Sequence, residues 1–255
     1  MKANSLLSLV AVSLLTFASF GCNSAPGRPK AEPEIPRPEE VHDFATLYKQ
    51  NCAACHGENG KQGAAISLAN AEYLSVAGED TLLRITAKGV PGTLMPPFAK
   101  SAGGMLTDQQ IRDLVDGMMH QWGKPDAITG QNAPSYAATG AGDVQQGQQV
   151  FTTYCASCHG ADGTGLTTKD AGAKVSHGSI VDPSYLALVS DQSLRTTTIV
   201  GLPSQGMPDW RGDVPSHAMT DKEVTDVVAW LASHRTQFPG QPYPNPTVPA
   251  APHQQ

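Results

Sequence analysis

The feature that most constrains this chain is a hexapeptide that occurs twice. Cys52-Ala53-Ala54-Cys55-His56-Gly57 returns 103 residues later as Cys155-Ala156-Ser157-Cys158-His159-Gly160. Further residues recur at a constant offset of 112, namely Tyr73, Leu74, Leu82, Gly89, Pro91, Met95 and Pro96, which return as Tyr185, Leu186, Leu194, Gly201, Pro203, Met207 and Pro208. A repeat of this length indicates two tandem copies of one folding unit. The second copy therefore has nine extra residues, around 169–178.

The pattern Cys-x-x-Cys-His is the attachment signal for c-type haem. The two thiols add to the haem vinyl groups, and the adjacent histidine reaches the iron from the same turn. We therefore predict two covalent haems. Their attachment cysteines and axial histidines are Cys52, Cys55 and His56 in the first copy, and Cys155, Cys158 and His159 in the second.

Zinc binding and disulfide formation are the alternative interpretations of these cysteine pairs. A structural zinc site needs four ligands, whereas each half of the chain offers one cysteine pair and one histidine at close spacing. Disulfides suit exported proteins, but they leave both histidines and the repeat unexplained.

Each copy also contains one methionine beside proline, Met95 in Leu94-Met95-Pro96-Pro97 and Met207 in Gly206-Met207-Pro208-Asp209. A thioether is a soft ligand that favours reduced iron, and the prolines fix the backbone without supplying a competing amide. We expect Met95 and Met207 to be the sixth iron ligands. The unmatched methionines are interpreted as core-filling residues: Met105, Met118, Met119 and Met219.

Other candidate ligands lack a counterpart in the other copy. The remaining histidines are interpreted as surface residues, and they stand at positions 42, 120, 177, 217, 234 and 253. Among them, His177 and His217 are the first candidates to replace a methionine as an iron ligand. Trp210 and Arg211 follow Met207 closely, and they either hold haem propionates or belong to a surface loop.

Each copy is expected to end in an amphipathic helix. Thr107 with Gln110, and Thr220 with Glu223, form the capping-box pattern that marks a helix start. Apolar residues follow at helical spacing, at Ile111, Leu114, Val115 and Met118, and at Val224, Val227, Val228 and Leu231. A similar apolar face precedes each hexapeptide.

Residues 40–125 and 143–236 resemble class I c-type cytochromes in these motifs. The resemblance implies an all-α fold, with two tandem domains that each surround one haem. It also implies that the first and last helices of a domain cross at a glycine and an aromatic residue. Gly147 and Phe151 match that pattern, whereas Phe44 and Tyr48 stand there in the first copy, so its crossing is expected to be looser or differently packed. The family's carbonyl acceptor for the ligating histidine has no clear equivalent, and residue 67 is where we expect it in the first copy.

The flanking segments predict export and a tether. Residues 1–22 have the pattern of a signal peptide, and Ser19-Phe20-Gly21-Cys22 resembles the lipobox of bacterial lipoproteins, so we expect a periplasmic protein anchored by lipid at Cys22. Proline-rich composition predicts a spacer at 23–39 and a disordered tail at 238–255. The two cytochrome domains then occupy 40–125 and 143–237, with a linker at 126–142.

Charge and coordination limit the function. The net charge of −6 argues against nucleic acid and favours redox partners with a basic docking face. We expect an electron-transfer protein, not an enzyme, that carries electrons from a quinol-oxidising or dehydrogenase complex to a terminal acceptor in a respiratory chain. The alternatives are a permanent cytochrome subunit of such a complex, which the second copy resembles, a diheme peroxidase-type enzyme, and a haem-based sensor.

Overall fold

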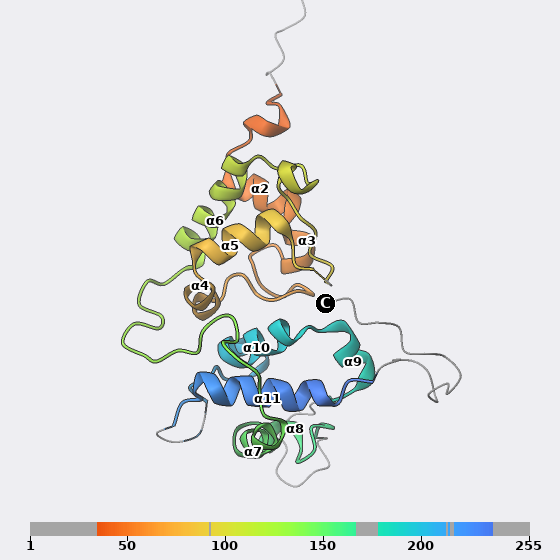
Figure 1. Ribbon diagram of the computed structural model, residues 1–255. Helices are drawn as coiled ribbons and strands as arrows, with labels where there is room; N and C mark the ends of the chain where they lie inside the picture. The colour runs from red at the N-terminus through yellow and green to blue at the C-terminus, as the bar shows by residue number, and fades with distance from the viewer. Residues whose placement is uncertain (1–34, 92, 167–177, 213, 215–216, 237–255) are drawn as a thin grey trace, which may run out of the picture. The chain divides into compact units, whose positions relative to one another are not determined.

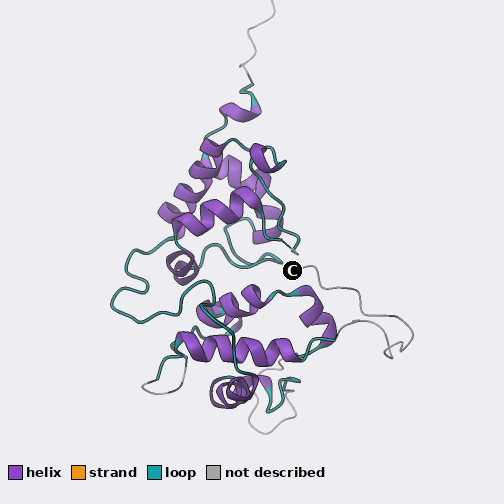
Figure 2. Cartoon of the chain, viewed as in Figure 1, coloured by secondary structure: helices purple, strands orange, loops and turns teal. Residues whose placement is uncertain are grey.

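The computed structural model describes residues 35–91, 93–166, 178–212, 214 and 217–236 (Figure 1). These residues form helices joined by loops, and no strand occurs among them (Figure 2). The all-α class predicted from the sequence is therefore confirmed. The chain divides into two units between Arg37 and Pro38, and the second unit holds both haem-binding motifs. The predicted signal peptide, lipobox and tail, most of the spacer, and most of the insertion in the second copy lie outside the described residues.

Corresponding helices follow one another in the two copies. The first copy contains α2 (Phe44–Asn51), α3 (Ala53–His56), α4 (Ala71–Ala77), α5 (Glu79–Lys88) and α6 (Asp108–Trp122), with short 3-10 turns at Pro38–Glu40 and Lys100–Ala102. The second contains α7 (Val144–Tyr154), α8 (Ala156–His159), α9 (Pro183–Leu188), α10 (Asp191–Val200) and α11 (Asp221–Ser233), with a 3-10 turn at Pro203–Gln205. None of the helices in the described ranges is long and apolar enough to cross a membrane.

Polar side chains fix where the helices begin. Both predicted capping boxes are confirmed, because the hydroxyls of Thr107 and Thr220 accept hydrogen bonds from the amides of Gln110 and Glu223, and the longer side chains return the interaction. Asp43 and Asp143 cap α2 and α7 in the same way. The first and last helices of both copies therefore begin at side-chain caps.

The core of each domain lies between its first and last helices and the central helix α5 or α10. All eight apolar residues predicted for the buried faces of α6 and α11 are buried. Met118 and Met219 are buried and Met119 packs against the core, as expected. Met105 is an exception, because it is 81% exposed next to the tight loop that precedes α6. Its interpretation as a core residue was wrong.

Candidate functional site: two haem-binding motifs

The hexapeptide folds into the same backbone turn in both domains. Cys52 ends α2 with φ and ψ of −118° and −35°, and Cys155 ends α7 with −117° and −34°. A short helix follows each cysteine and ends at the motif histidine. Gly57 then takes a φ of 83°, where a Cβ would lie 1.9 Å from the carbonyl oxygen of Lys61. Glycine is thus required for the chain to fold back beside the histidine.

His56 is held with one ring nitrogen available for a metal. Its side chain is 7% exposed, and Nδ1 lies 2.8 Å from the carbonyl oxygen of Ile66. Because a carbonyl only accepts, Nδ1 carries the proton and Nε2 keeps its lone pair. Burial lowers the pKa of His56, which favours the neutral imidazole that binds a metal.

The acceptor for His56 differs by one residue from the expected position. We expected it at residue 67, but Ser67 instead donates a hydrogen bond to the carbonyl oxygen of Gly60. The carbonyl of Ile66 takes the role. Because any residue supplies a carbonyl, no side-chain pattern in the sequence distinguishes Ile66 from its neighbours.

The first cysteine of each motif lies in surroundings that disfavour the thiolate. Burial, together with the neighbouring Cys55, raises the pKa of Cys52 to about 11, and burial with Cys158 raises that of Cys155 to about 12. Zinc binds thiolates, which these environments disfavour, whereas a thioether to haem is neutral. The cysteines of both motifs form no disulfide, which leaves them available for attachment, and no group of three or more His, Cys, Asp or Glu side chains placed to hold a metal ion occurs among the described residues.

The two methionine loops close against the ends of α5 and α10. Gly89 and Gly201 end these helices with φ of 70° and 66°, and a Cβ at either position would lie 2.7 Å from the carbonyl oxygen of Met95 or Met207. Each loop is therefore seated on a glycine. The repeat contains both glycines, but their recurrence alone does not indicate this role.

Local hydrogen bonds hold the backbone of each methionine at a defined place in its loop. The amide of Val90 donates to the carbonyl oxygen of Met95 at 3.1 Å, and the hydroxyl of Thr93 accepts from the Met95 amide at 3.2 Å. Leu202 and Met207 exchange hydrogen bonds of 3.0 and 3.2 Å between their backbones. Both methionine side chains are half-buried. Each domain thus presents a histidine and a methionine from two separate, internally braced elements.

Trp210 and Arg211 have different environments in the second domain. Trp210 is buried, and its amide and carbonyl bond to Ile199 and Met219. The guanidinium of Arg211 pairs with Asp209 and lies 3.2 Å from Glu72 Oε1. It also covers the Trp210 ring at 4.7 Å. Asp209 and then Glu72 raise the pKa of Arg211, so its charge is already balanced by protein carboxylates.

Of the other described histidines, His42, His120 and His217 are exposed, whereas His234 is half-buried beside the Trp230 ring. His42 pairs with Asp113 at 2.6 Å, and His217 lies 3.2 Å from Glu223. Nδ1 of His234 lies 2.9 Å from the carbonyl oxygen of Trp230 on its own helix, and His120 is exposed. The positions of His177 and His253 lie outside the described residues.

Two family models match the chain, one over each domain. Residues 39–116 match the model described as cytochrome c oxidase, cbb3-type, subunit III. Residues 144–235 match the model described as cytochrome c. Both matches contain a complete Cys-x-x-Cys-His motif, and the methionine that recurs downstream lies within each of them.

Several characterised proteins are similar to this chain. The FixP subunit of a cbb3-type cytochrome c oxidase from Sinorhizobium medicae (strain WSM419) is 34% identical over 130 residues, which cover 48% of this chain and 39% of that protein. FixP from Rhizobium meliloti (strain 1021) is 30% identical over 176 residues, or 65% of this chain and 52% of that subunit. A thiosulfate dehydrogenase from Stutzerimonas stutzeri (strain A1501) is 24% identical, with 74% of this chain and 61% of the enzyme covered.

The two family matches agree with the two hexapeptides, the repeated fold and the arrangement around His56. The residues fit a covalent haem, because the buried neutral imidazole presents one free nitrogen and each methionine loop is seated on a glycine. The chain spans only about half or less of the oxidase subunits named above. It is a diheme class I c-type cytochrome with two tandem cytochrome c domains and two covalent haems.

Proposed function

We propose that this cytochrome transfers electrons between proteins of a respiratory chain, from a quinol-oxidising or dehydrogenase complex to a terminal acceptor. The observation that supports the proposal is that each domain holds its motif histidine at the end of a short helix and carries the repeated methionine in a loop after its central helix, α5 or α10. We assign attachment to Cys52, Cys55, Cys155 and Cys158, and axial ligation to His56, Met95, His159 and Met207. Bound haem supplies an iron that alternates between ferrous and ferric states.

In this proposal, a histidine and a methionine of the chain would hold each bound haem from opposite sides. The hydrogen bond to Ile66 keeps the His56 ring in one orientation and one tautomer. The close contacts at Gly89 and Gly201 fix the backbone of Met95 and Met207 beside the ends of α5 and α10. A rigid pair of ligands favours electron transfer over substrate binding, because substrate binding requires a position that opens.

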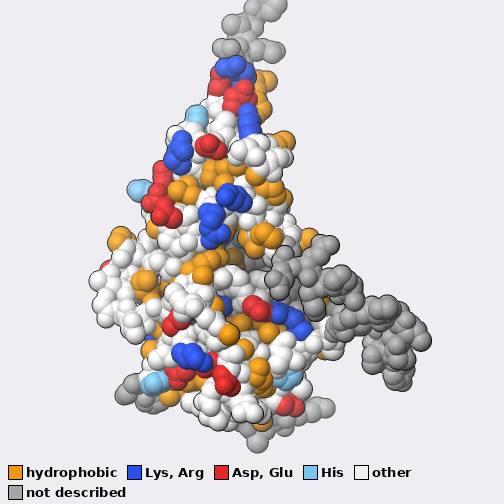
Figure 3. All heavy atoms as spheres, in the orientation of Figure 1, with side chains coloured by type: hydrophobic (Ala, Val, Ile, Leu, Met, Phe, Trp, Pro, Cys, Tyr) orange, Lys and Arg blue, Asp and Glu red, His pale blue; other side chains and the backbone are white. Residues whose placement is uncertain are grey.

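The partner proposal rests on charge and on the relatives. The chain has a net charge of −6, and Figure 3 shows acidic and basic side chains interspersed on one face, with no continuous basic patch. A redox partner with a basic docking region fits such a surface, whereas nucleic acid does not. Because FixP proteins are subunits of cbb3-type oxidases, we propose a terminal oxidase of that type as the acceptor. A permanent place in such a complex is the alternative.

Carbon monoxide binding tests the proposed ligation. We expect the reduced wild-type protein to bind no carbon monoxide at neutral pH, and Met95→Ala and Met207→Ala each to open one haem. The altered haem should also have a lower reduction potential, because a ligand that favours ferrous iron is lost. Met105→Ala is the matched control, since this methionine is exposed outside both loops. Rapid carbon monoxide binding to the wild type would contradict the proposal for that haem.

An enzymatic role is the second candidate, because a thiosulfate dehydrogenase is among the relatives. That role predicts reduction of the oxidised cytochrome by thiosulfate at a catalytic rate. We propose that the protein is not an enzyme. Thiosulfate should then reduce the wild-type cytochrome no faster than it reduces two controls, the Met105→Ala variant and a chain denatured with its haems retained. Turnover that is lost in Met95→Ala or Met207→Ala would favour the enzyme.

We also propose that the protein is periplasmic and anchored through Cys22. The lipobox-like segment before this residue supports the proposal. Growth with a labelled fatty acid should mark the wild-type protein but not Cys22→Ser. Equal labelling of both proteins, or of neither, would indicate secretion without this anchor.

A further inference from the structure

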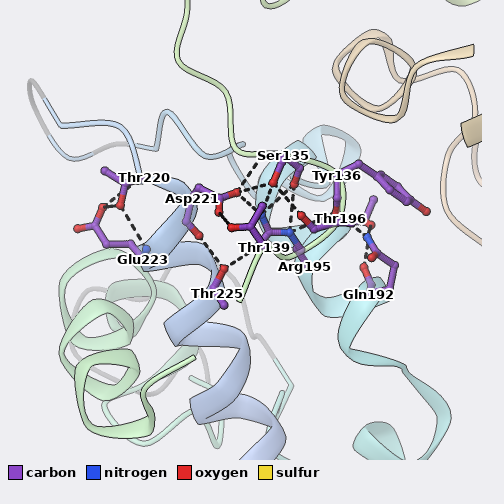
Figure 4. Close-up of polar contacts among 11 residues, drawn as sticks. Ser135, Tyr136, Thr139, Gln192, Arg195, Thr196, Thr220, Asp221, Glu223 and Thr225 are labelled. Carbon is purple, nitrogen blue, oxygen red and sulfur yellow. Dashed lines mark hydrogen bonds and ion pairs between the residues drawn. The ribbon is translucent and has the colours of Figure 1, made fainter. Parts of the chain in front are cut away.

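A buried arginine joins the interdomain segment to the second domain. Arg195 lies on α10, and its side chain is 2% exposed. Figure 4 shows its guanidinium surrounded by polar groups from α11 and from the segment that precedes α7. An arginine is always charged, so its burial requires partners that replace the lost water.

Two of these partners are backbone carbonyls of the interdomain segment. The Ser135 carbonyl oxygen accepts from Nη2 at 2.8 Å and from Nε at 3.1 Å, and the Tyr136 carbonyl oxygen accepts from Nε at 3.2 Å. Gln192, one turn before Arg195 on α10, donates to the same Tyr136 carbonyl at 2.8 Å. Consecutive carbonyls are thus fixed by consecutive turns of one helix.

Asp221 completes the attachment from α11. Its carboxylate pairs with Arg195 and accepts 2.9 and 2.8 Å hydrogen bonds from the amide and hydroxyl of Ser135. Arg195 Nη1 also donates to the hydroxyl of Thr225 at 2.9 Å. Ser135 is therefore held by its amide, its hydroxyl and its carbonyl, which is unusual for an exposed connecting residue.

The attachment is specific to the second domain. At the repeat offset of 112 residues, the counterpart of Arg195 in the first copy is Leu83, which has no charge to hold a backbone carbonyl. Only the second domain is preceded by a segment that connects it to another haem domain. The buried arginine therefore occurs in the domain whose preceding segment links it to another haem domain.

We propose that Arg195 is a positioning residue that clamps residues 135–136 to the second domain and so restricts the separation of the two haem domains. Lys124 is tied to the first domain through a hydrogen bond from Ser75, so residues 125–134 span the two attachments, and within them Gln131 accepts a 3.2 Å hydrogen bond from Arg211. Ten residues reach at most roughly 35 Å, against roughly 60 Å for a free linker of the predicted 126–142. The inference rests on the proposed electron transfer, since a short tether keeps the haems within range of each other.

Hydrogen exchange and pulsed electron paramagnetic resonance test the clamp on the holoprotein. In Arg195→Met, we expect exchange of the Ser135 amide to become about 10- to 100-fold faster, because the Ser135 carbonyl loses its charged donor and Asp221, which accepts from the amide, loses the charge that it pairs with. The distribution of distances between the two oxidised haems should become broader. Arg112→Met is the matched control, since this exposed arginine on α6 donates hydrogen bonds to Gln109 on its own helix.

The outcomes separate the clamp from the proposed function. Unchanged exchange at Ser135, or faster exchange with an unchanged haem-to-haem distribution, would overturn the clamp. Fewer than two haems in the wild-type protein would instead contradict the proposed function. If Arg195→Met does not fold, Arg195→Lys keeps the charge but loses the two-pronged guanidinium, and it should give the same changes to a smaller degree.

Discussion

In both domains the first and last helices cross where one carries a glycine and the other a large aromatic residue, but the two domains place these residues on opposite helices. Phe44 and Gly147 both stand eight residues before the first motif cysteine, and Gly117 and Trp230 both stand ten residues after the capping threonine. In the first domain the large residue is on the first helix and the glycine on the last. In the second domain the arrangement is reversed. A helix crossing therefore needs one glycine and one aromatic residue, but either helix can supply either of them.

The first and last helices approach each other closely in both domains, but different atoms limit the approach. A Cβ at Gly147 would lie 2.0 Å from the carbonyl oxygen of Asp226, so the backbone of α11 occupies the space. A Cβ at Gly117 would lie 2.1 Å from the Phe44 ring, which is a side chain. The two crossings are therefore packed differently, as expected from the sequence. Its glycine makes room for an aromatic ring, whereas the second lets two backbones meet.

Aromatic contacts follow the same exchange. In the first domain Trp122, the last residue of α6, lies 5.5 Å from the Phe44 ring and 5.0 Å from that of Tyr48. In the second domain Trp230 lies 4.2 Å from Phe151. The first domain thus recruits an additional aromatic residue where its helices are held apart by Phe44.

The largest expected effect comes from placing the large residue on both helices. Gly147→Phe should destabilise the second domain by about 3 kcal/mol or more, because the ring has no space beside Asp226 and Trp230. Circular dichroism and haem content should show loss of the second domain alone. Trp230→Gly in the same chain should restore part of the stability, since the pair then matches the first domain. No rescue would show that the two crossings are not equivalent.

Removing the large residue from the first domain should have the next largest effect. Phe44→Ala should cost about 2 to 3 kcal/mol, which is at the lower end for such changes because Phe44 is only partly buried. Denaturant unfolding, followed through the fluorescence of Trp122 in a chain with Trp210 and Trp230 replaced by Phe, measures this cost. A loss below about 0.5 kcal/mol, within the range of ordinary surface changes, would mean that Gly117 is not complementary to Phe44.

A matched pair of small substitutions compares backbone with side-chain limits. Gly147→Ala should destabilise its domain by about 1 to 3 kcal/mol, because the backbone at Asp226 must move. Gly117→Ala should cost less than about 1 kcal/mol, since the Phe44 ring can shift and alanine favours the helix. Equal losses in thermal unfolding of the two variants would contradict the distinction between the crossings.

Much of this architecture was predictable because it depends on local patterns. The capping boxes confirmed at Thr107 and Thr220 use side chains at fixed spacing, and the buried faces of the last helices follow their apolar period. Two covalent haems followed from motifs that require particular residue types. The residues assigned to each haem remain predictions, and the methionine variants test the axial ligands among them.

The features that sequence reasoning missed depend on the backbone or on distant partners. Ile66 acts through its carbonyl, and Ser135 is held by Arg195, which is 60 residues away. Met105 could not be distinguished from the core methionines by residue type, but it lies in a loop that exposes it. None of these roles has a local signature, because each is created by where the chain returns in space.

The smallest expected effect concerns how the two domains hold the segments before them. Gln110 donates to the carbonyl oxygens of Pro38 and Val41 at 2.7 and 3.0 Å, so the first attachment uses a neutral amide. The second uses Asp221. Burial raises its pKa, but hydrogen bonds from Ser135 and the charge of Arg195 outweigh that effect, and the pKa lies below the ordinary 3.8.

A lowered pKa in the folded state stabilises the attachment above pH 3.8, and this contribution is lost as the pH falls through the lowered value. We therefore expect protection of the Ser135 amide to decrease in strong acid, by a modest factor because Asp221 is about a third exposed. Asp221→Asn should lower the protection at neutral pH and remove most of its acid dependence. The segment held by Gln110 serves as the internal comparison, in an Asp113→Asn background that removes the nearby carboxylate paired with His42. Equal acid dependence of the two segments in that background would show that the charge of Asp221 does not distinguish the second attachment from the first.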